Sequence, residues 1–174
     1  ITSTPKITAQ LRDDDSGIDI NTLVVKIDTK TVTATSTAVT GGYDIEYTPT
    51  DALTDGPHTV TIAVSDHDGN AATAASAAFV VDTTPPSLSI TSPVDGLKTN
   101  KSALIVSGTT NDATSNPVTI TIKVNGTDAG AVTVEENGAF SKSVTLSDGE
   151  NTIVITATDK AGKVSTVTRT VTLR

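Results

Sequence analysis

The chain of 174 residues is long enough for two domains that each bury one core, and its net charge of −8 disfavours binding to nucleic acid or to anionic membrane surfaces. Aromatic residues make up only 2 % of it, so a sugar-binding platform of stacked rings is hard to build. It has no cysteine, which excludes disulfides and thiol catalysis, and no apolar run reaches the length of a membrane span.

Alternation of apolar and polar residues, bounded by Gly, Asp, Asn and Pro, predicts strands along the whole chain. In the first half we expect strands at Ile7–Leu11, Leu23–Asp28, Thr31–Ala34, Tyr43–Thr48, His58–Ser65 and Ala72–Val81. In the second half we expect them at Leu88–Thr91, Ala103–Gly108, Val118–Asn125, Ala131–Val134, Ala139–Leu146, Asn151–Thr158 and Val164–Leu173. No helix of ordinary length is indicated, and the predicted fold class is therefore all-β.

One segment occurs twice. Leu53–Asn70 is echoed by Leu146–Lys163, and both consist of a Leu-x-Asp-Gly turn, an alternating strand and an Asp-x-x-Gly turn. A repeat after roughly ninety residues predicts two copies of one module. The consecutive prolines of Asp82–Pro86 favour a short, stiff connector, so the expected domains are residues 1–84 and 85–174.

Both modules resemble bacterial Ig-like repeats of secreted and surface proteins. In the first module the resemblance lies in Asp15–Asp19, Leu53–Gly56, His58–Ile62, Asp66–Asn70 and Asp82–Pro86. The second module is similar to domain B of glucodextranases at Thr91–Gly96, Val106–Thr110, Val124–Gly126, Asp148–Asn151 and Ala157–Gly162. The resemblance implies two immunoglobulin-like antiparallel β-sandwiches in tandem, used as spacer or adhesive repeats, and it implies no catalytic residues.

The two modules differ where they begin. The second opens with a strand and an Asp-Gly turn at Leu88–Gly96, whereas the first has only Ile1–Pro5 before its equivalent of the next strand. The first strand of the first module is therefore expected to be truncated. Either Ile1–Thr4 is a remnant edge, or a strand from another subunit fills the position, because an open sheet edge is a template for strand addition.

Acidic loops are the sites where metal chemistry is expected. In an Ig-type sandwich two of the loops emerge at the same end, which should gather acids there and produce a Ca²⁺ site of hard oxygen ligands. The expected ligands at the end of the first module and at the junction are Asp13, Asp15, Asp19, Asp66, Asp68, Asp82, Asp112 and Asp159. The alternative is that these are turn residues that hydrogen-bond their own backbone, which accounts for Asp66 but leaves Asp68 unexplained.

Calcium is the one cofactor that these loops suggest, and the histidines His58 and His67 have no serine partner at a nucleophile elbow, so we expect no enzyme. The expected function is a structural or adhesive module of an extracellular stalk, adhesin or surface assembly, secreted or at the cell surface. Its expected partners are neighbouring Ig-like domains of the same or another chain and a cell-surface or glycan receptor, with no nucleic acid and no membrane insertion. Two alternatives are a filament subunit assembled by strand exchange and an accessory binding module of a secreted polysaccharide-active enzyme.

Overall fold

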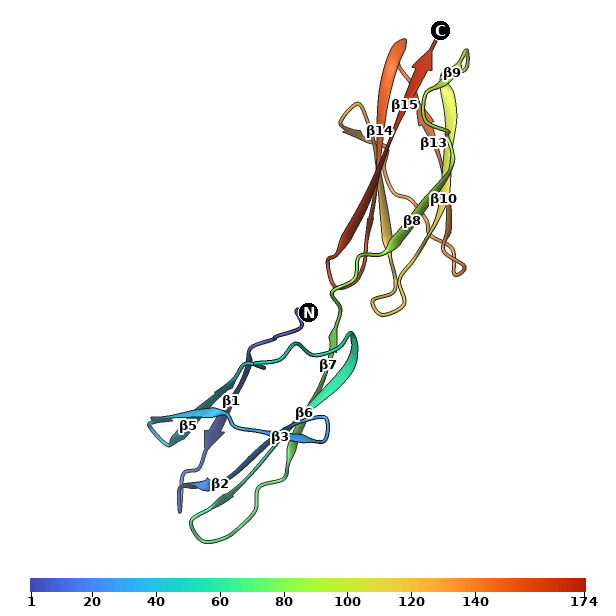
Figure 1. Ribbon diagram of the computed structural model, residues 1–174. Coiled ribbons are helices and arrows are strands. Elements are labelled where there is room, and N and C mark those ends of the chain that lie inside the picture. Colours follow the sequence, from blue (N-terminus) through green and yellow to red (C-terminus); the bar gives the residue numbers. More distant parts are fainter. The chain divides into compact units, whose positions relative to one another are not determined.

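The computed structural model describes residues 1–174 as an all-β chain in two units, Ile1–Thr83 and Thr84–Arg174. Each unit is a sandwich of two sheets, which confirms the predicted fold class (Figure 1). No helix with the length and hydrophobicity of a membrane span is present.

The first unit has seven strands rich in Val, Ile and Thr, the residues that suit a half-buried pleated surface. They are β1 (Ile7–Arg12), β2 (Ile18–Ile27), β3 (Lys30–Val32), β4 (Thr35–Val39), β5 (Gly42–Tyr47), β6 (Gly56–Asp66) and β7 (Ala75–Val81). One sheet has the order β1-β5-β4 and the other β3-β2-β6-β7. All of these pairs are antiparallel.

The second unit has eight strands in sheets of order β13-β10-β8 and β12-β11-β14-β15-β9. They are β8 (Ser87–Ser92), β9 (Leu97–Thr99), β10 (Ala103–Asn111), β11 (Thr119–Val124), β12 (Thr127–Asp128), β13 (Ala139–Thr145), β14 (Gly149–Thr158) and β15 (Val164–Leu173). The short β9 runs parallel to β15, and every other pair is antiparallel.

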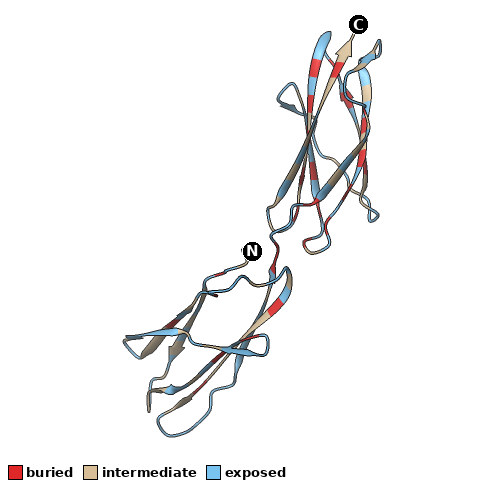
Figure 2. Ribbon diagram, viewed as in Figure 1, coloured by how far each residue is buried: buried red, intermediate tan, exposed pale blue.

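The two cores differ in size. The second unit buries one cluster of Val106, Val118, Ile120, Ile122, Phe140, Val144, Leu146, Ile153, Ile155, Ala157 and Val171, whereas the buried hydrophobic residues of the first unit are Val25, Ile27, Ile45, Val64 and Val81 (Figure 2). Part of the difference comes from β8, whose Leu88 and Ile90 pack against the second core. The first unit has no strand in the place of β8.

Ile1 occupies the position that β9 fills in the second unit. Its amino group donates to Val80 O at 3.0 Å, and its carbonyl accepts from Asp82 N–H at 3.1 Å. In the second unit the corresponding bond runs from Arg174 N–H to Thr99 O at 2.9 Å. Strand β1 pairs only with β5, so the other edge of β1 has no strand beside it.

Three strands of the structure were not predicted from the sequence, and one predicted strand is absent. The missed strands are β4, in which four of five residues are exposed, and the two- and three-residue strands β12 and β9. Ala131–Val134 was predicted as a strand, but it makes only a single bridge, from Val134 to Phe140. A tight turn, in which Gly138 N–H donates to Glu135 O at 2.8 Å, follows directly and ends the pairing there.

Candidate functional site

A tight turn after β14 fixes the carboxylate of Asp159. Asp159 N–H donates to Lys163 O at 3.0 Å, and Gly162 N–H donates to Asp159 O at 3.1 Å. Lys163 N–H in turn donates to Asp159 Oδ1 at 2.8 Å. The turn therefore satisfies one oxygen of this carboxylate and leaves the other, Oδ2, to its surroundings.

The loop after β10 holds a second carboxylate close to the first. Asp112 Oδ1 accepts from Thr114 N–H at 2.7 Å and from Ser115 N–H at 2.6 Å. Lys160 N–H donates to Ser115 O at 2.9 Å and so ties this loop to the Asp159 turn. As a result, carboxylate oxygens of Asp112 and Asp159 lie within 4.8 Å of each other.

Both carboxylates are withdrawn from water without a cationic partner. Asp112 and Asp159 are each 5 % exposed, and neither forms an ion pair with a lysine or arginine. Asp159 Oδ2 is buried and has no hydrogen-bond partner. A buried carboxylate oxygen of this kind carries a desolvation cost that a hydrogen bond or a cation normally offsets.

The equivalent turn in the first unit is fully satisfied. Asp66 Oδ1 accepts from Asn70 N–H at 2.7 Å, and Asp66 Oδ2 accepts from Asn70 Nδ2 at 2.8 Å. These bonds from the Asn70 side chain and backbone lower the pKa of Asp66. Lys163 stands where Asn70 does and has no amide to offer Asp159 Oδ2.

The other predicted calcium ligands in the loops of the first unit either accept hydrogen bonds from nearby backbone N–H groups or are exposed. Asp13 Oδ1 accepts from Asp15 N–H at 2.7 Å, and Asp19 Oδ1 accepts from Asn21 N–H at 3.1 Å. Asp15 and Asp68 are exposed. No three acids of this unit bring their oxygens within 4.8 Å of one another. Calcium at this end stays a prediction, as does a ligand role for Asp82, the residue that follows β7.

Comparison with known proteins supplies the family. Residues 86–174 match the family of glucodextranase, domain B, and residues 1–83 match the family of bacterial Ig-like domains. The chain belongs to the family of glucodextranase, domain B, whose model covers half of it, and its first unit is similar to bacterial Ig-like domains. The resemblance read from the repeated turns and strands is thereby confirmed.

Two known proteins are similar to this chain, one in sequence and one in fold. Bacillopeptidase F from Bacillus subtilis (strain 168) is 34% identical over 114 residues, which cover 66% of this chain but only 7% of the relative. The fibronectin(III)-like modules of CbhA from Clostridium thermocellum share the fold with a TM-score of 0.57 at 13% identity, over 99% of this chain and 87% of that one. Ig-like and fibronectin-like domains of this kind are typically non-catalytic modules.

The first Ig-like unit holds an ion pair that the sequence analysis missed. His58 is 8 % exposed and stacks on Phe79, with ring centroids 5.6 Å apart. Its Nδ1 lies 2.9 Å from Asp28 Oδ2, and its Nε2 lies 2.8 Å from Thr54 O. A carboxylate and a carbonyl only accept hydrogen bonds, so both ring nitrogens donate when the imidazole is protonated.

The second Ig-like unit has an equivalent hydrogen-bonded turn that is built from neutral side chains. Asp28 and Asn125 both have a left-handed backbone, with φ of 55° and 51°. Asp28 Oδ1 accepts from Thr59 N–H at 2.9 Å, and Asn125 Oδ1 accepts from Thr152 N–H at 2.8 Å. Asn151 takes the place of His58, because it accepts from Asn125 Nδ2 at 2.9 Å and donates to Ser147 O at 2.7 Å.

The ion pair makes the stability of the first unit depend on pH. Hydrogen bonds to Thr54 O and Asp28 raise the pKa of His58, and the bond from His58, with that from Thr59 N–H, lowers the pKa of Asp28. The His58 contribution is fully present below the unfolded pKa of about 6.5 and is lost as pH rises through the raised native pKa. The Asp28 contribution is present above 3.8 and is lost as pH falls through the lowered native pKa.

We therefore expect the melting temperature of the first unit to fall as the pH rises above about 6.5, through the raised native pKa of His58. Both tyrosines, Tyr43 and Tyr47, lie in this unit, so tyrosine fluorescence reports its unfolding alone. The double variant Asp28→Asn with His58→Asn copies the amide pair of the second unit and should remove this slope. A slope that persists in the double variant would show that other groups cause it.

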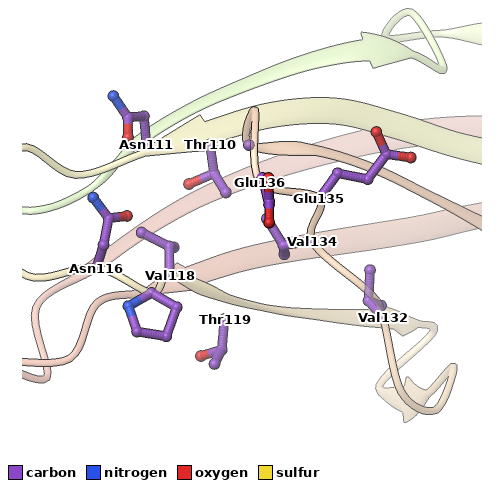
Figure 3. Close-up of a pocket in the computed structure, with 11 residues that line it drawn as sticks. Thr110, Asn111, Asn116, Val118, Thr119, Val132, Val134, Glu135 and Glu136 are labelled. Atoms are coloured by element: carbon purple, nitrogen blue, oxygen red, sulfur yellow. The ribbon is translucent and has the colours of Figure 1, made fainter.

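A pocket of about 690 Å³ opens in the second Ig-like unit where the segment between β12 and β13 forms no strand. Figure 3 shows Val118 and Val132 on its walls together with Asn116 and the acids Glu135 and Glu136. No aromatic ring, histidine, lysine or arginine lines it. The pocket thus offers no stacking surface for a sugar and no paired acid and base.

Proposed function

We propose that the chain is a load-bearing structural segment of an extracellular bacterial protein and has no enzymatic role. Two Ig-like units in series support this proposal, because such units are typical of surface and adhesion modules. Only the five residues 82–86 separate β7 from β8, and two of them are prolines, which limits how far the units can separate. Secretion, adhesion and neighbouring Ig-like domains as partners are parts of the proposal.

The observation that carries the proposal is the parallel pairing of β9 with β15 in the second unit. The chain enters this unit at the start of β8 and leaves it at the opposite end, after β15 (Figure 1). Leu97 pairs with Val171 and Thr99 pairs with Leu173. A force that pulls the two ends apart therefore shears several backbone hydrogen bonds at once instead of opening them one by one.

Single-molecule stretching of the whole chain tests this role. We expect two unfolding events, with the higher force for the second unit, because the first unit has only Ile1 beside β7. Lys98→Pro should lower that higher force, since proline disrupts a strand and removes a backbone donor. Lys98→Ala keeps the donor at the same exposed position and should leave the force unchanged. Equal forces in both variants would count against the load-bearing role.

A second candidate is a filament subunit completed by strand addition, and the open edge of β1 favours it. Ile7, Ala9 and Leu11 of this strand are only half-buried, so an added strand would cover apolar surface as well as pair the edge. Light scattering after size exclusion distinguishes the candidates. Polymers that grow with concentration support strand addition, and a monomer of 17.7 kDa at every concentration removes it.

A third candidate is an accessory module of a polysaccharide-active enzyme, and the match to domain B of glucodextranase favours it. Affinity electrophoresis in gels that contain glucans or chitin tests it directly. Retarded migration would support a glycan-binding role. Unretarded migration in every gel would remove it, in agreement with the 2 % aromatic content of the chain.

A further inference from the structure

We propose that the second unit binds one Ca²⁺ ion between the carboxylates of Asp112 and Asp159. Their oxygens lie within 4.8 Å of each other, and both side chains are buried, with 5 % of each residue exposed. Two carboxylates at this distance repel each other, and a cation between them turns the repulsion into attraction. The calcium site does not depend on the load-bearing role, so each of the two proposals can be tested separately.

The Oδ2 oxygen of Asp159, which is buried and accepts no hydrogen bond, distinguishes this pair of carboxylates from an ordinary acidic turn. The same turn in the first unit closes with Asn70, whose side-chain amide fills Asp66 Oδ2 at 2.8 Å. The second unit keeps every backbone bond of the turn but replaces that amide by Lys163. Asp159 Oδ2 is consequently buried with no donor, and a carboxylate oxygen of Asp112 lies within 4.8 Å of a carboxylate oxygen of Asp159.

The donors favour calcium over other common cations. The two acidic side chains offer only oxygen, and the chain has no cysteine, whereas zinc prefers thiolate and imidazole. Ca²⁺ accepts six to eight oxygens in flexible geometry and takes water and main-chain carbonyls to complete its shell. Mg²⁺ requires a near-ideal octahedron and gives up its water reluctantly, so it should bind more weakly here.

Calcium titration of the full chain by calorimetry tests the site. We expect one ion per chain with a dissociation constant of about 0.1–1 mM, the range of extracellular calcium modules. Asp112→Asn and Asp159→Asn should each weaken binding about tenfold or more, because the site loses half of its carboxylate charge. Asp148→Asn removes an exposed acid from a turn of the same unit and should leave binding unchanged.

Lys163→Asn provides a variant that keeps both carboxylates. Its side-chain amide should fill Asp159 Oδ2 as Asn70 fills Asp66 Oδ2 in the first unit. Without metal, we expect the melting temperature of the second unit to rise by about 4–8 °C, the shift that one net hydrogen bond gives a domain of this size. Calcium affinity should fall at the same time, because the amide competes with the ion.

Four outcomes of these titrations support or overturn the proposed calcium site. Binding at one site that is lost in both aspartate variants and weakened in Lys163→Asn supports the proposal. Absence of calcium binding by the unchanged chain overturns it. So does binding that survives Asp112→Asn and Asp159→Asn, since the ion would then lie elsewhere. Equal affinity for Mg²⁺ and Ca²⁺ would overturn the choice of cation.

Discussion

Replacing Ile122 by alanine is expected to lower the free energy of unfolding of the second unit by about 2–5 kcal/mol. Ile122 is 0% exposed, lies in the middle of β11 and pairs with Ile155 of β14, which is equally buried. Removal of three carbons from this position loses their burial and leaves a cavity that a sandwich sheet cannot collapse to fill. For a domain of about ninety residues, the loss corresponds to a fall in melting temperature of roughly 10–30 °C.

The measurement is thermal unfolding followed by two signals. Far-ultraviolet circular dichroism reports both units, whereas tyrosine fluorescence reports only the first, where Tyr43 and Tyr47 lie. The dichroism transition of the second unit should shift, and the fluorescence transition should stay. Thr121→Ala, on the exposed face of the same strand, should change the stability by no more than about 0.5 kcal/mol. Equal losses in the two variants would mean that the second core is not organised as described.

The architecture could be predicted because its signals are local and repeated. Val118 to Val124 alternates apolar with polar residues, and β11 buries its isoleucines and exposes the residues between them. The strand β4 has no such alternation, because Thr35–Ala38 consists of small residues, three of them polar. Its pairing with β5 was therefore not predicted. Ala131–Val134 alternates as a strand should, but it lacks a neighbouring strand to pair with.

The candidate site could be predicted only in part. Asp112 and Asp159 were expected to lie near each other because loops at one end of an Ig-type sandwich are neighbours, and the structure brings them together. What decides the chemistry is the partner of each oxygen, which depends on side chains in the turn. The exchange of Asn70 for Lys163 was visible in the aligned repeats, and it was the available signal for an unsatisfied carboxylate.

The pair of His58 and Asp28 shows a different limit. The two residues are thirty positions apart and belong to adjacent antiparallel strands and their turn, so their contact depends on the register of β2 against β6. The available signal was again the repeat, in which His58 aligns with Asn151 and the turn at Asp28 aligns with the turn at Asn125. Because these residues hydrogen-bond at equivalent turns of the two units, they indicate a shared structural role rather than catalysis.

Replacing Gly138 by alanine is expected to destabilise the second unit far more than replacing Gly162 by alanine. Both glycines have a left-handed backbone, with φ of 82° and 83°, so both variants carry the same conformational cost of about 1–2 kcal/mol. A Cβ at Gly138 would lie 2.0 Å from Thr110 O, whereas a Cβ at Gly162 would meet nothing within 4 Å. The close approach exists because Thr110 N–H donates to Gly138 O at 2.9 Å.

The clash should add about 1–3 kcal/mol for Gly138→Ala beyond the cost seen in Gly162→Ala. Denaturant unfolding followed by circular dichroism measures both losses, with the tyrosine signal of the first unit as an internal reference. Because backbone conformation is matched, the difference between the variants isolates the contact between the β12–β13 segment and β10. Equal losses would show that this segment moves away from β10 at no cost, which would also leave the pocket beside it without a fixed wall.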